Sequence, residues 1–206
     1  PRAAWPFPAA VSASPGLPGG SPKVNGVAAF HLTKPSPDFR PPIEVKKLLL
    51  PRPLLYETWS RTSFPRLKVR EYDLVHSTTI VSPPATSQPL VVSVHDLAFR
   101  RFPDRFPQRA RRLFERSWKR VLERADAVLC PSAATSADLL AAGLDAERLH
   151  LVPLGHDPQI VDKEVAVGVR ERFGITGDYI LAAGTLEPRK NIQTLIKAFL
   201  EIAPRT

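Results

Sequence analysis

The sequence predicts an α/β protein with a parallel, doubly wound sheet. From about residue 73 onward, short apolar runs alternate with longer amphipathic segments, as in strands joined by crossover helices. An apolar run such as 179–183, which ends at Gly184, is typical of a strand buried on both faces. A stretch without periodicity, 158–162, then interrupts the alternation. We therefore expect one α/β domain that ends near residue 157 and a second that begins after it.

Residues 1–42 are rich in proline, carry no acidic residue before Asp38 and show no hydrophobic periodicity. Such a composition is expected to be extended or disordered. Two interpretations stay open for this segment, an upstream extension and a divergent piece of the first domain.

The first domain is expected to span residues 43–157. A short helix is predicted at 51–59, because its prolines fall in the first turn, where a helix tolerates them. Its inward-facing residues are expected to be Leu54, Leu55 and Trp59. The other elements expected before residue 108 are strands at 43–50, 73–76 and 90–96, and loops at 82–89 and 99–107.

A long amphipathic helix is predicted at residues 109–124. Its apolar stripe consists of Ala110, Leu113, Phe114, Trp118, Val121, Leu122 and Ala125. Its opposite face is basic and consists of Arg109, Arg111, Arg112, Arg116, Lys119, Arg120 and Arg124. This face is interpreted as a solvated surface or as a contact with an anionic membrane. Nucleic acid is not expected, because no aromatic side chain interleaves with the charges to stack on bases.

Two carboxylates on this helix, Glu115 and Glu123, are expected to form ion pairs such as Glu115 with Lys119, with no catalytic role. After the helix we expect a strand at 125–130 and a helix that starts at Pro131–Ser132. Thr135 and Asp138 are predicted to form a capping-box-like pair in that helix, and Gly143 ends it. A strand at 149–153 and a helix at 163–173 follow.

Residues 179–200 predict a strand, a turn and a helix. Asn191 is a favourable N-cap, and Ile192, Leu195, Ile196, Phe199 and Ile202 fall on one helical face. Arg189 and Lys190 thus lie between the carboxyl end of a strand and the amino end of a helix, where α/β proteins bind anions. Two interpretations stay open from this pattern alone, a diphosphate site and an ordinary loop with two exposed basic residues.

His76, His95 and Asp96 each lie at the carboxyl end of a predicted strand, at the edge of the sheet where open α/β proteins bind ligands. A histidine there can orient a hydroxyl or shield a developing charge. We favour a structural role for His76 and a functional role for His95, because Asp96 lies beside it. Asp96 and His76 are kept as candidate cleft residues.

Composition limits the partners and the compartment. The net charge of +9 favours anionic partners such as nucleotide phosphates, acidic lipid or nucleic acid. The single Cys130 excludes an intrachain disulfide and favours a reducing, cytoplasmic compartment. No apolar stretch approaches about 18 residues, so no transmembrane helix is expected. No Cys/His cluster indicates a metal, and no GxGxxG or P-loop pattern indicates a standard dinucleotide or P-loop site.

We expect the chain to be a fragment that is cut at both ends. It contains no Met, and it stops just after a predicted helix, without the strand that an α/β unit needs next.

Four motifs occur in order at residues 94–99, 128–132, 152–157 and 184–191, with Thr135 and Asp138–Leu139 after the second. Together they resemble family 4 glycosyltransferases, the retaining group with the GT-B fold, and the mannosyltransferase-like "group 1" kind in particular. The resemblance covers about residues 73 to 206. It implies two Rossmann-like domains: most of an N-terminal acceptor-side domain at 43–157, and at 158–206 an interdomain link with the first βα unit of a donor-binding domain.

The resemblance also implies a chemistry. Arg189 and Lys190 match the basic pair that holds the diphosphate of a nucleoside-diphosphate sugar, and Gly184 lets the backbone approach it. His95 matches the active-site histidine near the donor sugar. The implied reaction is transfer of a hexose, with mannose as the first candidate, to a polysaccharide or lipid-linked acceptor. It retains the anomeric configuration and needs no metal or other cofactor.

The sequence departs from the family pattern in three places. Thr185 stands where many members have an arginine, the Gly-rich loop near the family's N-terminus is not recognisable in 1–42, and the family's acidic motif is absent. The chain by itself is therefore expected to be inactive. The alternative function is a non-catalytic nucleotide- or carbohydrate-binding module of the same fold. A cytoplasmic protein at the inner face of the membrane, held there by the basic helix 109–124, is the expected location.

Overall fold

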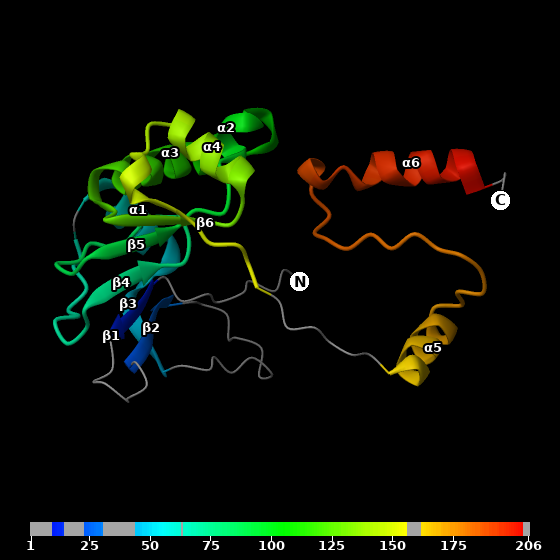
Figure 1. Ribbon diagram of the computed structural model, residues 1–206, viewed down its shortest axis with the longest axis horizontal. Helices are drawn as coiled ribbons and strands as arrows, with labels where there is room; N and C mark the ends of the chain where they lie inside the picture. Colours follow the sequence, from blue (N-terminus) through cyan, green and yellow to red (C-terminus); the bar gives the residue numbers. More distant parts are fainter. Residues whose placement is uncertain (1–9, 15–22, 31–43, 63, 156–161, 204–206) are drawn as a thin grey trace. The chain divides into compact units, whose positions relative to one another are not determined.

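The structure is a computed structural model that describes residues 10–14, 23–30, 44–62, 64–155 and 162–203. The chain forms two compact units, one up to Leu154 and the other from Gly155 onward. The described part of the first unit contains strands β1 to β7 and helices α1 to α4, and that of the second contains helices α5 and α6, which an extended segment joins (Figure 1).

The first unit is built on a seven-stranded sheet with the order β3-β2-β1-β4-β5-β6-β7. Neighbouring strands from β4 to β7 run parallel, whereas β1 runs antiparallel to both β2 and β4. The predicted α/β class with a Rossmann-like parallel sheet is confirmed, and the sheet is mixed only at β1. The strands are β1 Ala10–Ser14, β2 Lys23–Phe30, β3 Glu44–Pro51, β4 Leu74–Ser77, β5 Leu90–Ser93, β6 Ala127–Cys130 and β7 Leu149–Leu151.

Strands β1 and β2 lie within residues 1–42, where the sequence predicted no regular structure. That expectation is wrong for these two strands. β1 and β2 pair with each other, and they join the rest of the sheet through β4 on one side and β3 on the other, which both lie outside this segment. Strand formation that depends on distant partners leaves a weak local signal, particularly in a proline-rich segment. The strands agree with the alternative interpretation, a divergent piece of the domain.

The helices are α1 Arg52–Arg61, α2 Ala98–Arg101, α3 Gln108–Arg124, α4 Ala133–Ala141, α5 Lys163–Arg172 and α6 Ile192–Ile202. Three 3₁₀ turns accompany them, η1 Pro103–Arg105, η2 Ala146–Arg148 and η3 Pro188–Lys190. The segment 99–107, predicted as a loop, contains most of α2 and all of η1. No helix in the described parts of the chain is long and apolar enough to cross a membrane.

Two tryptophans anchor the core of the first unit. Trp59 on α1 and Trp118 on α3 are each 1% exposed, and their indole N–H groups donate to the carbonyls of Pro65 (2.7 Å) and Ala142 (3.3 Å). Both polar atoms therefore keep a partner while the rings are buried. The predicted inward position is confirmed for Leu55 and Trp59, but Leu54 is 51% exposed and that prediction is wrong.

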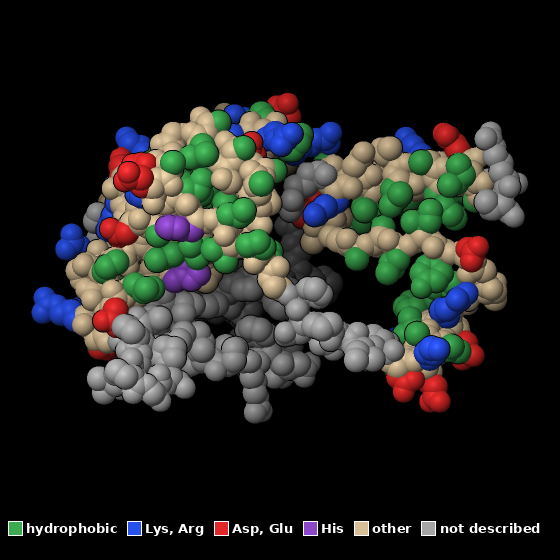
Figure 2. Space-filling model, in the orientation of Figure 1, with side chains coloured by type: hydrophobic (Ala, Val, Ile, Leu, Met, Phe, Trp, Pro, Cys, Tyr) green, Lys and Arg blue, Asp and Glu red, His purple; other side chains and the backbone are tan. Residues whose placement is uncertain are grey.

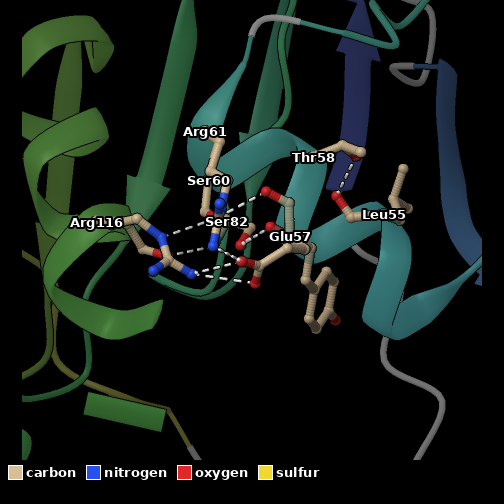
Figure 3. Close-up of polar contacts among 9 residues, drawn as sticks. Leu55, Glu57, Thr58, Ser60, Arg61, Ser82 and Arg116 are labelled. Carbon is tan, nitrogen blue, oxygen red and sulfur yellow. Dashed lines mark hydrogen bonds and ion pairs between the residues drawn. The ribbon is translucent and has the colours of Figure 1, made fainter. Parts of the chain in front are cut away.

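Polar contacts join α1 to α3 (Figure 3). The Arg116 guanidinium on α3 donates to both carboxylate oxygens of Glu57 on α1, each at 3.0 Å, and to the hydroxyl of Ser60 at 3.3 Å. Arg61 also pairs with Glu57, at 2.6 Å. A bidentate guanidinium–carboxylate pair fixes orientation as well as distance, so this contact sets how α3 lies against α1.

The start of α4 is capped differently from the prediction. The Ser132 hydroxyl accepts from the backbone N–H of Thr135 at 3.1 Å, which makes Ser132 the N-cap. The predicted Thr135–Asp138 pair is therefore wrong, because the helix begins one turn earlier than that pair requires. Gly143, with φ 92°, ends the helix as expected.

The second unit has helices but no strand among its described residues. The predicted strand at 179–183 has no strand conformation, and Ile180 and Leu181 are 59% and 80% exposed. The prediction is wrong for a physical reason: a strand needs a backbone partner, and the described part of this unit offers none. The helices need no such partner, and α5 is capped by the Asp162 carboxylate, which accepts from the N–H of Glu164 at 3.1 Å.

Candidate functional site

The first group of candidate residues lies where β4 and β5 end. His76 on β4 is half-buried, and its Nε2 lies 2.8 Å from the Ser93 hydroxyl at the end of β5. Burial lowers the pKa of His76 below its usual value, and the charge of nearby His95 lowers it further. A lowered pKa favours the neutral form of the ring.

His95 follows β5 and is exposed. Its Nε2 lies 3.2 Å from the carbonyl oxygen of Thr78, in the segment that follows β4. A carbonyl oxygen only accepts, so Nε2 must carry the hydrogen, and Nδ1 of the neutral ring is left as an acceptor. The backbone of His95 is also fixed, because its own carbonyl accepts from the Thr135 hydroxyl on α4 at 3.1 Å.

Asp96 has a structural contact. Its carboxylate accepts from the backbone N–H of Ala98, the first residue of α2, at 2.9 Å. This bond ties the residue after His95 to the start of the short helix. The side chain of Asp96 is exposed, and its role as a cleft residue stays a prediction.

The second group of candidates lies in the loop 184–191 of the second unit. η3 runs directly into α6, with Asn191 between them in the left-handed conformation (φ 53°, ψ 34°). Lys190 is exposed, and its backbone N–H donates to the carbonyl of Glu187 at 3.0 Å. Gly184 is exposed, and a Cβ there would meet nothing within 4 Å. For Arg189 the structure describes the backbone in η3, and the side chain lies outside the described part.

Asn191 occupies the cap position of α6 but does not cap the helix with its side chain. Its carbonyl accepts from the N–H groups of Thr194 and Leu195, and its side-chain oxygen accepts from the Thr194 hydroxyl at 2.8 Å. The predicted N-cap position of Asn191 is therefore confirmed, although its side chain makes no cap hydrogen bond. The consequence is that the first-turn amides of α6, next to Lys190, face no capping side chain.

Sequence reasoning missed three residues that hold the histidines. Ser93, Thr78 and Thr135 bind His76 or His95, and only Thr135 had been singled out, for another role. Only Ser93 gave a local signal, as a hydroxyl residue at the end of an apolar run, since Thr78 acts through its backbone carbonyl and Thr135 lies within α4. Among the described residues no group of three or more His, Cys, Asp or Glu side chains is placed to hold a metal ion. The prediction that no cofactor takes part stays a prediction.

Comparisons with known proteins agree with these observations. The sequence profile described as Glycosyltransferase Family 4 matches residues 18–160. Among solved structures, the crystal structure of Anabaena Alr3699/HepE in complex with UDP superimposes with a TM-score of 0.52 and 22% sequence identity. That likeness covers 77% of this chain and 44% of the other, so the chain spans less than half the length of the protein it resembles.

The structural likeness shows a shared fold, and the predicted GT-B-type α/β architecture is confirmed by it. A search of curated protein sequences gave no match.

Proposed function

Because the profile covers residues 18–160, the chain belongs to glycosyltransferase family 4, and we propose that the whole protein transfers a hexose from a nucleoside-diphosphate sugar. Mannose is the first candidate sugar, and the acceptor is a polysaccharide or a lipid-linked saccharide. The similar Anabaena protein was crystallised with UDP, which supports a nucleoside diphosphate as the donor's leaving group. The single Cys130, which is buried and free, supports a cytoplasmic location.

The observation that carries the proposal is the arrangement at the start of α6. Lys190 is exposed in η3 immediately before an 11-residue helix whose first-turn amides face no capping side chain. An amino end of this kind, together with a cation, attracts a phosphate group. We assign the diphosphate to Lys190, Arg189 and the backbone at Gly184.

The proposed chemistry needs little more than charge and position. The bond between the anomeric carbon and the diphosphate oxygen breaks, and a bond to the acceptor oxygen forms on the same face of the sugar. The acceptor's proton passes to an oxygen of the leaving diphosphate. Negative charge grows on that diphosphate as the bond breaks, so Lys190 and Arg189 would stabilise the transition state more than the ground state. No metal or other cofactor is required in this scheme.

In the first unit, we assign His95 to a hydroxyl group of the donor sugar. Its Nε2–H is occupied by the Thr78 carbonyl, so Nδ1 is the atom that would accept a hydrogen bond from a substrate hydroxyl. His76 and Ser93 support the same edge of the sheet from beneath. Asp96 fixes the start of α2 beside it.

Transfer of radiolabelled sugar by the full-length protein tests the proposal. Lys190→Ala is expected to lower kcat by about 100-fold or more, the usual effect of removing one group that stabilises a developing anion. Lys197→Ala, which removes an exposed lysine from α6 itself, is the matched control and should leave transfer unchanged.

Unchanged transfer by Lys190→Ala would overturn the assignment of the diphosphate site. Binding of a nucleoside diphosphate by the full-length protein, with no transfer to any acceptor offered, would instead indicate the non-catalytic module.

A further inference from the structure

We propose that the first unit docks on an anionic membrane surface through an arginine patch formed by Arg101, Phe102, Arg105, Arg109 and Arg112. These residues come from α2, η1 and the first turns of α3, which follow one another in the chain, and α2 packs against both of the other elements. The proposal concerns only part of the basic helix, and it is independent of the donor and of catalysis.

Two arginines in the second half of α3, Arg116 and Arg120, have partners inside the protein. Arg116 is bound by Glu57, and Arg120 donates to the carbonyl of Arg61 at 2.6 Å and pairs with Glu123 at 3.2 Å. These arginines hold α3 against α1 and against its own neighbouring turn.

Arg100 is also used for folding. Its guanidinium donates to both carboxylate oxygens of Glu115 and lies over the rings of Phe99 and Trp118, at 5.9 and 5.8 Å from their centroids. Glu115 and Glu123 both form ion pairs, as predicted, but the example pair of Glu115 with Lys119 is wrong: Arg100 pairs with Glu115, and Lys119 pairs with Glu123. Arg100 thereby fastens α2 to α3, and it leaves the adjacent Arg101 at the surface.

The arginines of the patch have no such partners. Arg101, Arg105, Arg109 and Arg112 are exposed, and none of them forms an ion pair with a residue that the structure describes. Asp104 is the only acidic residue in the sequence between 100 and 114. Figure 2 shows Lys and Arg side chains gathered over α2, next to hydrophobic ones.

The patch contains an exposed aromatic side chain. Phe102 is 50% exposed, and the Arg101 guanidinium lies 5.8 Å from the centre of its ring. Aromatic rings favour the boundary between lipid headgroups and acyl chains, and arginines beside them reach the phosphates. A surface that combines one exposed ring with several unpaired arginines therefore fits a bilayer interface.

The patch is held in shape by the aromatic side chains beneath it. Phe99 stacks on Phe114 with centroids 5.1 Å apart, and Phe106 meets the same ring edge-on at 6.1 Å. The backbone N–H of Phe106 donates to the carbonyl of Pro103, closing η1. The arginines are thus presented on a braced turn, which reduces the ordering cost of binding.

Charge also excludes the nearest alternatives. A second copy of this chain carries the same net charge of +9 and would be repelled at this surface. A nucleic acid would need several aromatic faces along a basic track to stack its bases, and the patch exposes one ring. The anionic headgroups of a bilayer need only a concentrated positive surface with an interfacial anchor.

Cosedimentation of the 206-residue chain with vesicles tests the proposal. Wild-type chain is expected to bind vesicles of phosphatidylglycerol and phosphatidylcholine, to bind pure phosphatidylcholine weakly, and to be released by salt. The variant Arg101→Gln/Arg105→Gln/Arg109→Gln should bind anionic vesicles about 100-fold more weakly, since each basic residue near such a surface contributes about fivefold. Circular dichroism checks that this surface variant remains folded.

The matched control removes three charges elsewhere on the same unit. Lys68→Gln/Arg70→Gln/Lys119→Gln has the same net charge as the patch variant, and all three side chains are exposed. It is expected to bind nearly as well as wild type. If both variants lost the same affinity for anionic vesicles, net charge and not the arginine patch would explain the binding, and the proposal would be overturned. Failure of the wild-type chain to bind anionic vesicles would also overturn it.

A fluorescent residue reports on the depth of insertion. The fluorescence of the indole introduced by Phe102→Trp is obtained by subtracting the wild-type emission. This emission should shift to the blue when anionic vesicles are added, and brominated lipid should quench it. An indole at this position that is neither shifted nor quenched would contradict the bilayer contact. A second result would also contradict the proposal. The wild-type chain would bind duplex DNA as tightly as anionic vesicles, and the patch variant would lose affinity for both to the same extent.

Discussion

Helices α3 and α6 carry similar apolar stripes, but they have opposite surroundings in the two units. On α3 the stripe is covered, with Trp118 1% and Val121 0% exposed. On α6 the equivalent positions remain open, with Leu195 39% and Phe199 41% exposed. The helical pattern is thus equally clear in both, and what differs is whether a sheet lies beneath it.

The strands make the same contrast. β5 pairs with β4 on one side and β6 on the other, so its buried run satisfies every backbone group. Residues 179–183 are just as apolar, yet they form no strand and stay exposed. Figure 2 shows hydrophobic side chains lying open along the second unit. Helices close their own hydrogen bonds locally, whereas strands and cores need partners from elsewhere in the chain.

The largest expected effect separates the two stripes directly. Trp118→Ala should lower the free energy of unfolding of the first unit by about 3–5 kcal/mol, because it empties a buried site and removes the bond to Ala142. Phe199→Ala on α6 should change the free energy of unfolding by about 1 kcal/mol or less. Urea unfolding followed by circular dichroism measures both.

A large loss in the free energy of unfolding for Phe199→Ala would contradict the contrast between α3 and α6. It would mean that the stripe of α6 is covered in solution by something that packs as closely as the sheet does in the first unit. Binding of a dye specific for exposed apolar surface, lower in Phe199→Ala than in wild type, is the result that agrees with an open stripe.

The second prediction concerns the contact that fixes α3. Arg116→Ala should cost about 1.5 kcal/mol, because it leaves the Glu57 carboxylate without its bidentate donor in a half-buried position. Glu123→Gln, which removes only exposed ion pairs of the same helix, should cost about 0.5 kcal/mol or less. The same urea titrations compare the two.

Arg116→Lys sharpens this prediction. A lysine keeps the charge but lacks the fork that binds both oxygens of Glu57, so it should restore less than half of the loss. Full recovery by lysine would show that charge alone, and not the geometry of Figure 3, holds α3 against α1.

The sequence predicted those elements whose signal is local. Such local signals are found in the apolar stripe of α3, in the apolar run of the strand Leu90–Ser93 and in the prolines at the start of α1. β1 and β2 were missed because, besides pairing with each other, they depend on β4 and β3, which lie far from them in the sequence. A strand was wrongly predicted at 179–183 because its apolar run is a local signal, whereas the described part of the second unit offers no strand for it to pair with.

The candidate site shows the same limit. The sequence placed His76 and His95 at strand ends, and the structure puts each there. It could not show that Ser93 binds His76 or that Thr78 fixes the tautomer of His95, because those contacts join residues 17 positions apart. The partner of Glu115 could not be predicted for the same reason. Glu115 pairs with Arg100 and not with the predicted Lys119, because α2 packs against α3.

Helix caps give a smaller contrast between the units. Ser132→Ala should destabilise the first unit by about 1 kcal/mol, because it removes the acceptor for the N–H of Thr135. Asn191→Gly should change the stability of α6 by only a few tenths of a kcal/mol, since the Asn191 side chain caps nothing and glycine accepts φ 53°. Amide exchange in the first turn of each helix measures the two effects, and equal loss of protection would contradict the assigned caps.

The last and smallest expected effect is a pH dependence confined to the first unit. The pKa of His76 is lowered in the folded protein, so the unfolded chain binds the proton more readily. Stability should therefore be fully present above about pH 6.5, the ordinary histidine pKa, and should fall as the pH drops below it toward the folded pKa.

His76→Gln should flatten that slope, measured as the urea midpoint between about pH 7.5 and about pH 5. His95→Gln should flatten it only in part, because burial is the larger cause of the shift and the charge of His95 the smaller. If His95→Gln alone removed the whole slope, the charge of His95, and not the burial of His76, would account for the lowered pKa of His76.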